Sequence, residues 1–221
     1  PDRTPTSLRD LDAEGLVVPA SSVPPPPELL VVLDTGSLQR LGSLADRVAA
    51  THEAGGHVVV LDHHVGNTRY GTHHFIDESA EATVVLALEV LDELGVVLDE
   101  PIARCLYAGL VTDTGSFRRA RAATHRMAAR LLEAGVDPEA TIGPFDSHPF
   151  SWMTMLSSVL GAAQLEPDAA QGLGLVFATV PLAVGAKARN EEIDSVIGIL
   201  RTTTEAEVTA VLKEIEPARW A

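Results

Sequence analysis

The most informative stretch of this sequence is Gly56-His57-Val58-Val59-Val60-Leu61-Asp62-His63-His64. An apolar run of strand composition that stops on an acid and two histidines is typical of a strand buried on both faces, as in a parallel sheet. In open α/β sheets, ligands bind at the carboxyl ends of the strands. Carboxylate and imidazole groups at that edge suit a divalent metal ion. The alternative is that the acid caps a helix and the histidines are ordinary polar loop residues.

The same pattern occurs earlier in the chain. The apolar run Leu29-Leu30-Val31-Val32-Leu33 is followed by Asp34-Thr35-Gly36-Ser37, and leucine and valine then recur at helical spacing between 38 and 48. Strand, helix and strand form one βαβ unit, whose right-handed crossover makes the two strands parallel. We therefore expect Asp34 and Asp62 at the same edge of the sheet.

A third acid follows an apolar helix. The helical pattern of residues 101–111 leads into Thr112-Asp113-Thr114-Gly115-Ser116-Phe117-Arg118. Carboxylates and imidazoles at these element ends could hold two ions about 3.5–4 Å apart, which would generate a nucleophile from water and offset phosphate charge. Backbone N–H groups of the small turns could approach an anion. Arg118 is a candidate phosphate clamp, and a solvated arginine is the alternative.

Composition limits the class of protein. The chain has 221 residues, 46% of them hydrophobic, and a net charge of −15, which argues against a surface for duplex DNA. The single cysteine, Cys105, is expected to be buried in an apolar helix and cannot form an intrachain disulfide. No apolar run approaches the roughly 20 residues of a membrane span. We expect a soluble, cytoplasmic protein without a membrane partner.

The pattern changes in the last third of the chain. The sequence predicts a long helix over 150–165, then a strand over 174–180, a helix over 191–200 and a strand over 207–215. This is a small α+β domain. Two strands and one helix are marginal alone, so we expect a chain that is cut short or completed by a partner.

Two common enzyme motifs are missing from the sequence. A Ser-His-Asp hydrolase would need a Gly-x-Ser-x-Gly elbow, and a dinucleotide-binding domain would need Gly-x-Gly-x-x-Gly after its first strand.

The motifs resemble those of the DHH phosphoesterase superfamily, specifically its oligoribonuclease and 3'-phosphoadenosine 5'-phosphate phosphatase subgroup with a DHHA1 second domain. Four segments carry the resemblance: Val32-Leu33-Asp34-Thr35-Gly36-Ser37, Val60-Leu61-Asp62-His63-His64, Ile76-Asp77-x-Ser79-x-x-Ala82-Thr83 and Leu106-Tyr107-Ala108-Gly109-Leu110-Val111-Thr112-Asp113-Thr114-Gly115-Ser116-Phe117. The resemblance implies an α/β fold: a parallel-sheet DHH domain over residues 1–146 with helices on both faces, a connecting helix over 147–167, and a partial α+β DHHA1 domain over 168–221.

The resemblance also implies roles for the site residues. Asp34 would bridge two Mn²⁺ ions, and His63 and Asp113 would complete the second metal site. His64 would face the scissile phosphate or a water, and Asp62 would orient the neighbouring imidazole. Ser116 and Arg118 are the candidate substrate-binding residues. The implied substrates are short RNA, linear dinucleotides such as pApA, the 3'-phosphate of phosphoadenosine phosphate and, within the family, cyclic di-AMP; a homodimer is implied as well.

Two features of the family pattern are missing. A His-x-x-x-Asp-x-Asp motif should precede Asp34, and a Gly-Gly-His motif of the DHHA1 domain should follow Ala221. The chain is therefore expected to be an internal fragment of an active enzyme or a degenerate copy. The alternative functions are a pyrophosphatase or polyphosphatase of the same superfamily, and a non-catalytic nucleotide-binding module.

Overall fold

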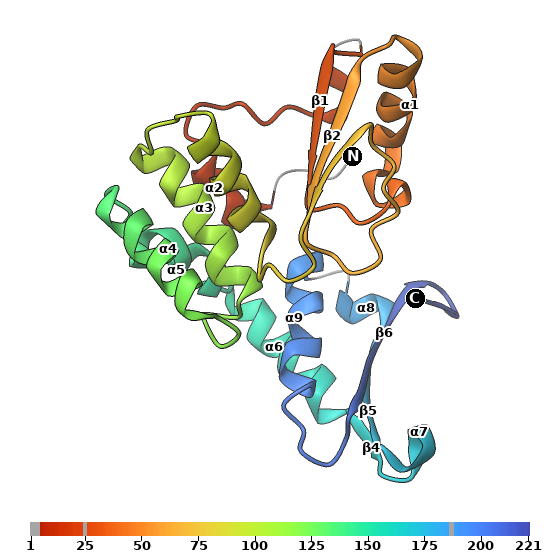
Figure 1. The fold of residues 1–221 in the computed structure, drawn as a ribbon. Helices are drawn as coiled ribbons and strands as arrows, with labels where there is room; N and C mark the ends of the chain where they lie inside the picture. Colours follow the sequence, from red (N-terminus) through yellow and green to blue (C-terminus); the bar gives the residue numbers. More distant parts are fainter. Residues whose placement is uncertain (1–4, 24–25, 186–187) are drawn as a thin grey trace. The chain divides into compact units, whose positions relative to one another are not determined.

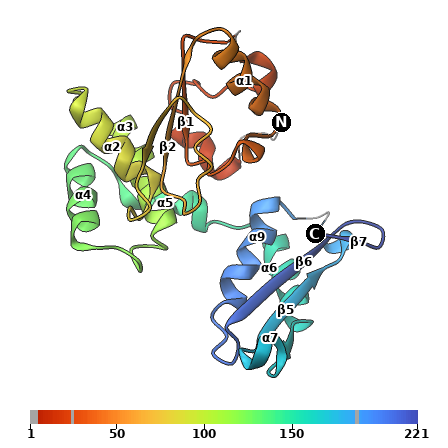
Figure 2. The ribbon, with the colours of Figure 1, turned by 45° about the vertical axis from the view of Figure 1, so that its right-hand side comes forward.

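The computed structural model describes residues 5–23, 26–185 and 188–221. The chain divides into two compact units, Pro1–Asp146 and Ser147–Ala221 (Figures 1 and 2). Each unit has its own sheet and its own hydrophobic core.

The first unit contains a parallel sheet with the strand order β1-β2-β3. Its strands are β1 (Leu29–Leu33), β2 (His57–Asp62) and β3 (His73–Ile76). The register pairs Leu33 with Leu61, so that Asp34 and Asp62 follow at the same edge. The predicted α/β class with a parallel sheet is confirmed.

The connection between β1 and β2 is less regular than the single predicted helix. It consists of η3 (Leu38–Leu44), a 3₁₀ segment, and helix α1 (Ala45–Glu53). Gly42 interrupts η3 with φ +54°, a value that glycine adopts without a steric penalty. The helical periodicity of the apolar residues thus predicted a helical connection between the strands but not this break.

Helices lie on both sides of the sheet: α1 on one side and α2 (Thr83–Glu93) on the other (Figures 1 and 2). Val48 of α1 packs against Val32, Val58 and Val60, all of them buried. The outward-facing residues of β1 are about half exposed, because this strand forms one edge of the sheet: Leu29, Val31 and Leu33.

The rest of the first unit is helical. It contains α2, α3 (Glu100–Asp113), α4 (Ala122–Glu133) and α5 (Pro138–Asp146), with the short η1 (Thr6–Leu11) and η2 (Ala20–Ser22) preceding the sheet. α2 and α3 meet closely at Gly109, where an added Cβ would lie 2.6 Å from Cγ1 of Val84. The Asp99 carboxylate caps α3 by accepting from the Ile102 N–H, at 3.0 Å. Both features fix the helix that ends on Asp113.

Cys105 is exposed on α3, contrary to the prediction that it is buried. Ala103, Leu106, Tyr107 and Leu110 form the buried side of this helix. Helical periodicity places Cys105 outside that stripe, and its Sγ lies 3.4 Å from the Leu11 carbonyl oxygen.

The second unit is a four-stranded mixed sheet in the order β4-β5-β6-β7 packed against helices α6 and α9. Its elements are α6 (Phe150–Gly161), β4 (Gln164–Glu166), α7 (Ala169–Gly172), β5 (Leu175–Val180), α8 (Leu182–Gly185), α9 (Asn190–Leu200), β6 (Val208–Glu216) and β7 (Arg219–Trp220). The core joins Val159 of α6 to Val180 of β5 and Val196 of α9.

Two details of the second unit differ from the sequence prediction. The helix from Phe150 ends at Gly161, because the residues that follow pair antiparallel with β5 as β4. The short strands β4 and β7 were not expected beside β5 and β6. α6 also contributes Met155 and Val159 to the core of this unit.

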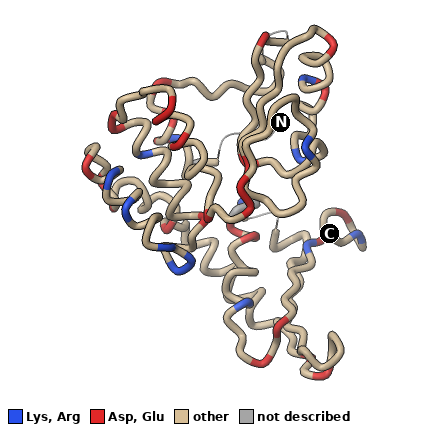
Figure 3. Tube along the Cα trace, in the orientation of Figure 1, with Lys and Arg blue, Asp and Glu red and all other residues tan. Residues whose placement is uncertain are grey.

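Acidic residues outnumber basic ones, 31 to 16, and they occur along both units (Figure 3). Within the described ranges, each helix is too short or too polar to span a lipid bilayer.

Candidate metal centre

Asp34 is the first residue after β1, and its backbone is unusual. Its N–H donates to the Leu61 carbonyl at 3.0 Å and continues the sheet ladder, but its φ is +57°, in the left-handed region. The Thr83 hydroxyl donates to Oδ1 of Asp34 at 2.7 Å. The Asp34 side chain is 51% exposed. The sharp turn therefore presents a carboxylate to solvent, with one oxygen fixed by a buried threonine.

Asp62, the last residue of β2, is fully buried. Its Oδ1 accepts from Nδ1 of His64 at 2.7 Å and from the His63 backbone N–H at 2.9 Å, while Oδ2 accepts from Nδ2 of Asn67 at 2.5 Å. Burial alone would raise the pKa of Asp62, but the hydrogen bonds from His64 and Asn67 outweigh it and lower the pKa. Asp62 is thus an ionised group whose oxygens are occupied by these donors.

Gly36 lets the turn after β1 approach Asp62 and His64. A Cβ at this position would lie 3.3 Å from Cβ of His64 and 3.6 Å from Oδ2 of Asp62. A larger residue would require a shift of a few tenths of an ångström at His64.

His63 has its ring orientation set by a backbone group. Its Nδ1 lies 3.1 Å from the Ala80 carbonyl oxygen, which can only accept, so Nδ1 carries a proton. The other ring nitrogen, Nε2, lies 3.7 Å from Oδ1 of Asp34. Nε2 is thus the ring atom of His63 that faces the carboxylate, as in a histidine that binds a metal ion.

His64 contacts groups on both sides of its ring. Its Nδ1–H donates to Asp62, and the same nitrogen lies 3.8 Å from Oδ1 of Asp34. Its Nε2 lies 3.3 Å from Nη1 of Arg40. The rings of His63 and His64 meet edge to face, with centroids 4.9 Å apart.

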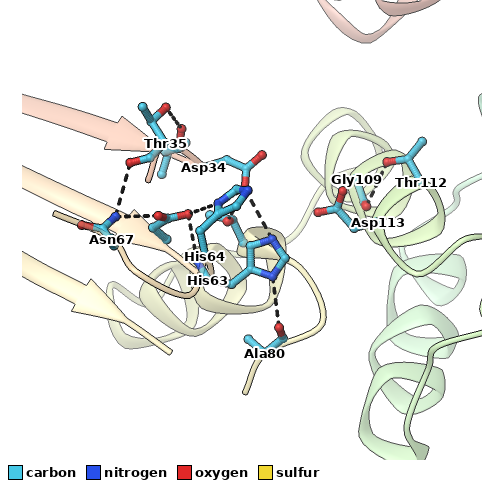
Figure 4. Close-up of polar contacts among 12 residues, drawn as sticks. Asp34, Thr35, His63, His64, Asn67, Ala80, Gly109, Thr112 and Asp113 are labelled. Carbon is cyan, nitrogen blue, oxygen red and sulfur yellow. Dashed lines mark hydrogen bonds and ion pairs between the residues drawn. The ribbon is translucent and has the colours of Figure 1, made fainter. Parts of the chain in front are cut away.

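Asp34, His63 and His64 form a group in which one ligand atom of each residue lies within 4.8 Å of the others (Figure 4). The Asp34 carboxylate and Nε2 of His63 are donors that suit a transition metal such as Mn, Fe or Zn, and the His64 ring lies beside them. The protonated Nδ1 of His63 fits this use, because metal-bound histidines usually donate their other N–H to a carbonyl or carboxylate.

Asp113 points toward this group from the end of α3 (Figure 4). Burial raises the pKa of Asp113, and repulsion from Asp34 adds to the effect, while His63 and His64 oppose it. Asp113 therefore faces the same region, although it lies outside the compact three-residue group. The geometry therefore joins β1, β2 and α3 around one region.

Ser116 and Arg118 lie on the turn that follows Asp113. The Ser116 N–H donates to the Val111 carbonyl at 2.8 Å, and Gly115 has φ +61°, as in a helix C-cap. Both side chains are exposed. Basic residues gather at this turn between α3 and α4 (Figure 3). The contact nearest to the site comes from Arg119, whose Nη2 donates to the Asp113 carbonyl at 2.6 Å.

The second histidine pair, His73 and His74, belongs to β3. Nε2 of His74 accepts from the Gly71 N–H at 3.1 Å, and the His73 ring contacts the His57 ring edge to face. Through these contacts both histidines pack within the sheet region.

Several residues of the site were not singled out from the sequence. Arg40, Asn67 and Thr83 each contact a strand-end residue through a side chain. Thr83 belongs to the segment Ala82-Thr83 of the family pattern, and this position could have identified it as a site residue. The Ala80 contact is made by a backbone carbonyl, which a side-chain pattern does not reveal.

Comparisons with known proteins agree with this geometry. Residues 2–110 match the family described as "DHH family, N-terminal domain", a range that contains Asp34, Asp62, His63 and His64. The "Bifunctional oligoribonuclease and PAP phosphatase NrnA" of Thermus thermophilus is 32% identical over 194 residues, which cover 87% of this chain and 55% of that protein. The "Probable bifunctional oligoribonuclease and PAP phosphatase NrnA" of Streptococcus mutans is 24% identical over 144 residues, covering 64% and 44%.

A solved structure has the same fold. It is an exopolyphosphatase-related protein from Bacteroides fragilis, with a TM-score of 0.82 and 17% identity over 95% of this chain and 64% of that one. The chain spans about half the length of the curated relatives named above, 55% and 44%.

Proposed function

Because this chain belongs to the DHH family, we propose that it is a metal-dependent phosphoesterase that hydrolyses short oligoribonucleotides or linear dinucleotides such as pApA. It would also remove the 3'-phosphate of 3'-phosphoadenosine 5'-phosphate, as the names of its relatives suggest. The observation that carries the proposal is the convergence of Asp34, His63 and His64 at two adjacent strand ends.

Asp34, His63 and Asp113 would hold Mn²⁺, two ions per site, with Asp34 shared between them. When bound, such ions lower the pKa of water and offset the charge of the attacked phosphate. Asp62 keeps the His64 ring in place through Nδ1, and the Ala80 carbonyl does the same for His63. His64 would face the phosphate, and Ser116 and Arg118, on the turn after Asp113, would contact the substrate.

The reducing cytoplasm is the proposed compartment, and a homodimer is the proposed assembly. Both come from the resemblance and the composition discussed above.

The test is Mn²⁺-dependent release of AMP from pApA, with a calorimetric measurement of Mn²⁺ binding on the same samples. We expect His63→Ala to weaken Mn²⁺ binding and to lower the rate at least about 100-fold, since metal ions supply several kcal/mol of charge stabilisation. His52→Ala, which removes an exposed histidine of α1, is the matched control and should change neither.

Three outcomes would contradict the proposal. Faster hydrolysis of pyrophosphate than of pApA would assign the chain to inorganic substrates. Tight Mn²⁺ and AMP binding without turnover would make it a nucleotide-binding module. Absence of Mn²⁺ binding by the wild-type chain would mean that the three-residue group is not a metal centre.

A further inference from the structure

Arg40 contacts the candidate site, and neither the sequence pattern nor the comparisons assign it a role. It lies on η3, six residues after Asp34, and its Nη1 is 3.3 Å from Nε2 of His64. The turn 34–37 connects β1 to η3. The same short segment therefore supplies both a candidate metal ligand and a cation.

The direction of this contact follows from the other side of the ring. Nδ1 of His64 lies 2.7 Å from Oδ1 of Asp62 and donates to this carboxylate, so Nε2 is the ring nitrogen that can accept. A guanidinium group can only donate. Arg40 therefore donates to His64, and it covers the ring nitrogen that the proposed function directs at the phosphate.

Arg40 has an imidazole partner where several other arginines have carboxylate partners. Those that pair with carboxylates are Arg104, Arg121, Arg130, Arg189 and Arg219. Within residues 5–23, 26–185 and 188–221, Arg40 forms no ion pair with a carboxylate, although three acids lie around the site. Its partner is an imidazole, which occupies one N–H of the guanidinium and neutralises none of its charge.

We propose that Arg40 binds the phosphate of the substrate, donating to a non-bridging phosphate oxygen in place of Nε2 of His64. A guanidinium fork matches two phosphate oxygens and binds them more strongly than it binds a neutral acceptor. The exchange would release Nε2 of His64 beside the same phosphate group. This inference rests on the proposed function, because it takes its ligand, a phosphate ester, from there.

The test uses three variants of the full chain. Arg40→Gln removes the charge, Arg40→Lys keeps the charge without the fork, and Arg126→Gln removes the charge of an exposed arginine on α4 as the matched control. Mn²⁺ affinity, affinity of the Mn²⁺-loaded chain for AMP, and the KM for pApA are measured for each. Circular dichroism verifies that each variant is folded.

We expect Arg40→Gln to weaken AMP binding and raise KM about 10- to 100-fold, as for hydrogen bonds to charged groups. Arg40→Lys should retain part of the affinity, and Mn²⁺ affinity should stay unchanged in all three variants. This pattern differs from that of His63→Ala, which should lose Mn²⁺ affinity first.

The proposal is wrong if Arg40→Gln behaves like Arg126→Gln while the wild-type chain binds AMP or hydrolyses pApA; the proposed function would then stand without it. A chain that binds AMP without turnover still tests Arg40 through AMP affinity. Failure of the wild-type chain to bind Mn²⁺ or AMP would overturn both proposals together.

Discussion

The two ends of helix α4 each have an arginine that forms a bidentate pair with an acid near one end of helix α2. At the beginning, Nε and Nη2 of Arg121 donate to the Glu81 carboxylate at 2.6 and 2.8 Å. At the end, Nη1 and Nη2 of Arg130 donate to the Asp92 carboxylate at 2.6 and 2.5 Å. The chemistry is the same, but the Glu81 side chain is 12% exposed and that of Asp92 is 41% exposed.

The pairs also differ in what else they hold. Glu81 accepts a further hydrogen bond from the Thr124 hydroxyl at 2.7 Å, and Nη2 of Arg121 donates to the Ser79 carbonyl at 2.6 Å. Between Ser79 and Glu81 lies Ala80, whose carbonyl orients His63. The first pair thus fixes the loop that positions a candidate metal ligand, whereas the second joins two helices in solvent. The importance of an ion pair depends on the group that it immobilises, and surface pairs by themselves contribute little.

The largest effect is expected for Glu81→Gln, which tests whether the first pair positions His63. The substitution keeps the size of the side chain and removes the charge that holds Arg121, so the Ala80 carbonyl should lose its fixed position. We expect Mn²⁺ affinity to fall about 10-fold or more, in the range found for residues that orient metal ligands, and the melting temperature to drop. Calorimetric titration and thermal unfolding measure the two effects, and unchanged Mn²⁺ affinity would refute the link to His63.

Acid should weaken the same pair without a mutation. The hydrogen bonds from Arg121 lower the pKa of Glu81 from its usual 4.5 to about 2, against the opposing effect of burial. An acid with a depressed pKa in the folded state stabilises the fold above its unfolded pKa, and the stabilisation disappears as pH falls through the folded pKa. The difference in free energy of unfolding between wild type and Glu81→Gln should therefore be constant above pH 5 and shrink from pH 4.5 towards 2. Urea denaturation at a series of pH values measures it; a difference independent of pH would contradict this account.

The smallest effect is expected for Asp92→Asn, the matched change at the other end of α4. Arg130 lowers the pKa of Asp92, but both side chains are largely in water, where ion pairs are screened. Mn²⁺ affinity should equal that of the wild type, and the melting temperature should hardly change. A loss of Mn²⁺ affinity comparable to that of Glu81→Gln would show that the two pairs act alike. The loop around Ala80 would then have no separate role in positioning His63.

The sheet of the first unit was predictable because its signals are local. Two apolar runs that end on Asp34 and Asp62, with one helical segment between them, predict parallel strands. The observed register of Leu33 with Leu61 places both acids at one edge of the sheet. The break at Gly42 and the strand β4 were missed. In both places the outcome depends on glycine conformation or on a partner strand, neither of which the hydrophobic period encodes.

The candidate metal ligands were predictable from the sequence, but the residues that contact and orient them were less so. Asp34, His63 and His64 stand in a recognisable pattern, and the structure brings them together. Arg118 was the predicted phosphate-binding residue because it follows Asp113 in the sequence. The arginine that contacts His64 is Arg40, which lies on a different element. The Glu81–Arg121 pair spans 40 positions in the sequence. Such a contact arises because α2 and α4 both pack on α3, and no short sequence motif predicts it.

The left-handed backbone of Asp34 has a consequence for any attempt to make this protein more heat-resistant. A non-glycine residue in that conformation costs roughly 1–3 kcal/mol, and the Asp34 carboxylate also repels Asp113. Selection for thermal tolerance alone would therefore favour Asp34→Asn, which tolerates the same φ and removes the repulsion. The most heat-resistant descendants would be those that had lost the carboxylate, so a stabilisation campaign on this fold needs a simultaneous selection for metal binding.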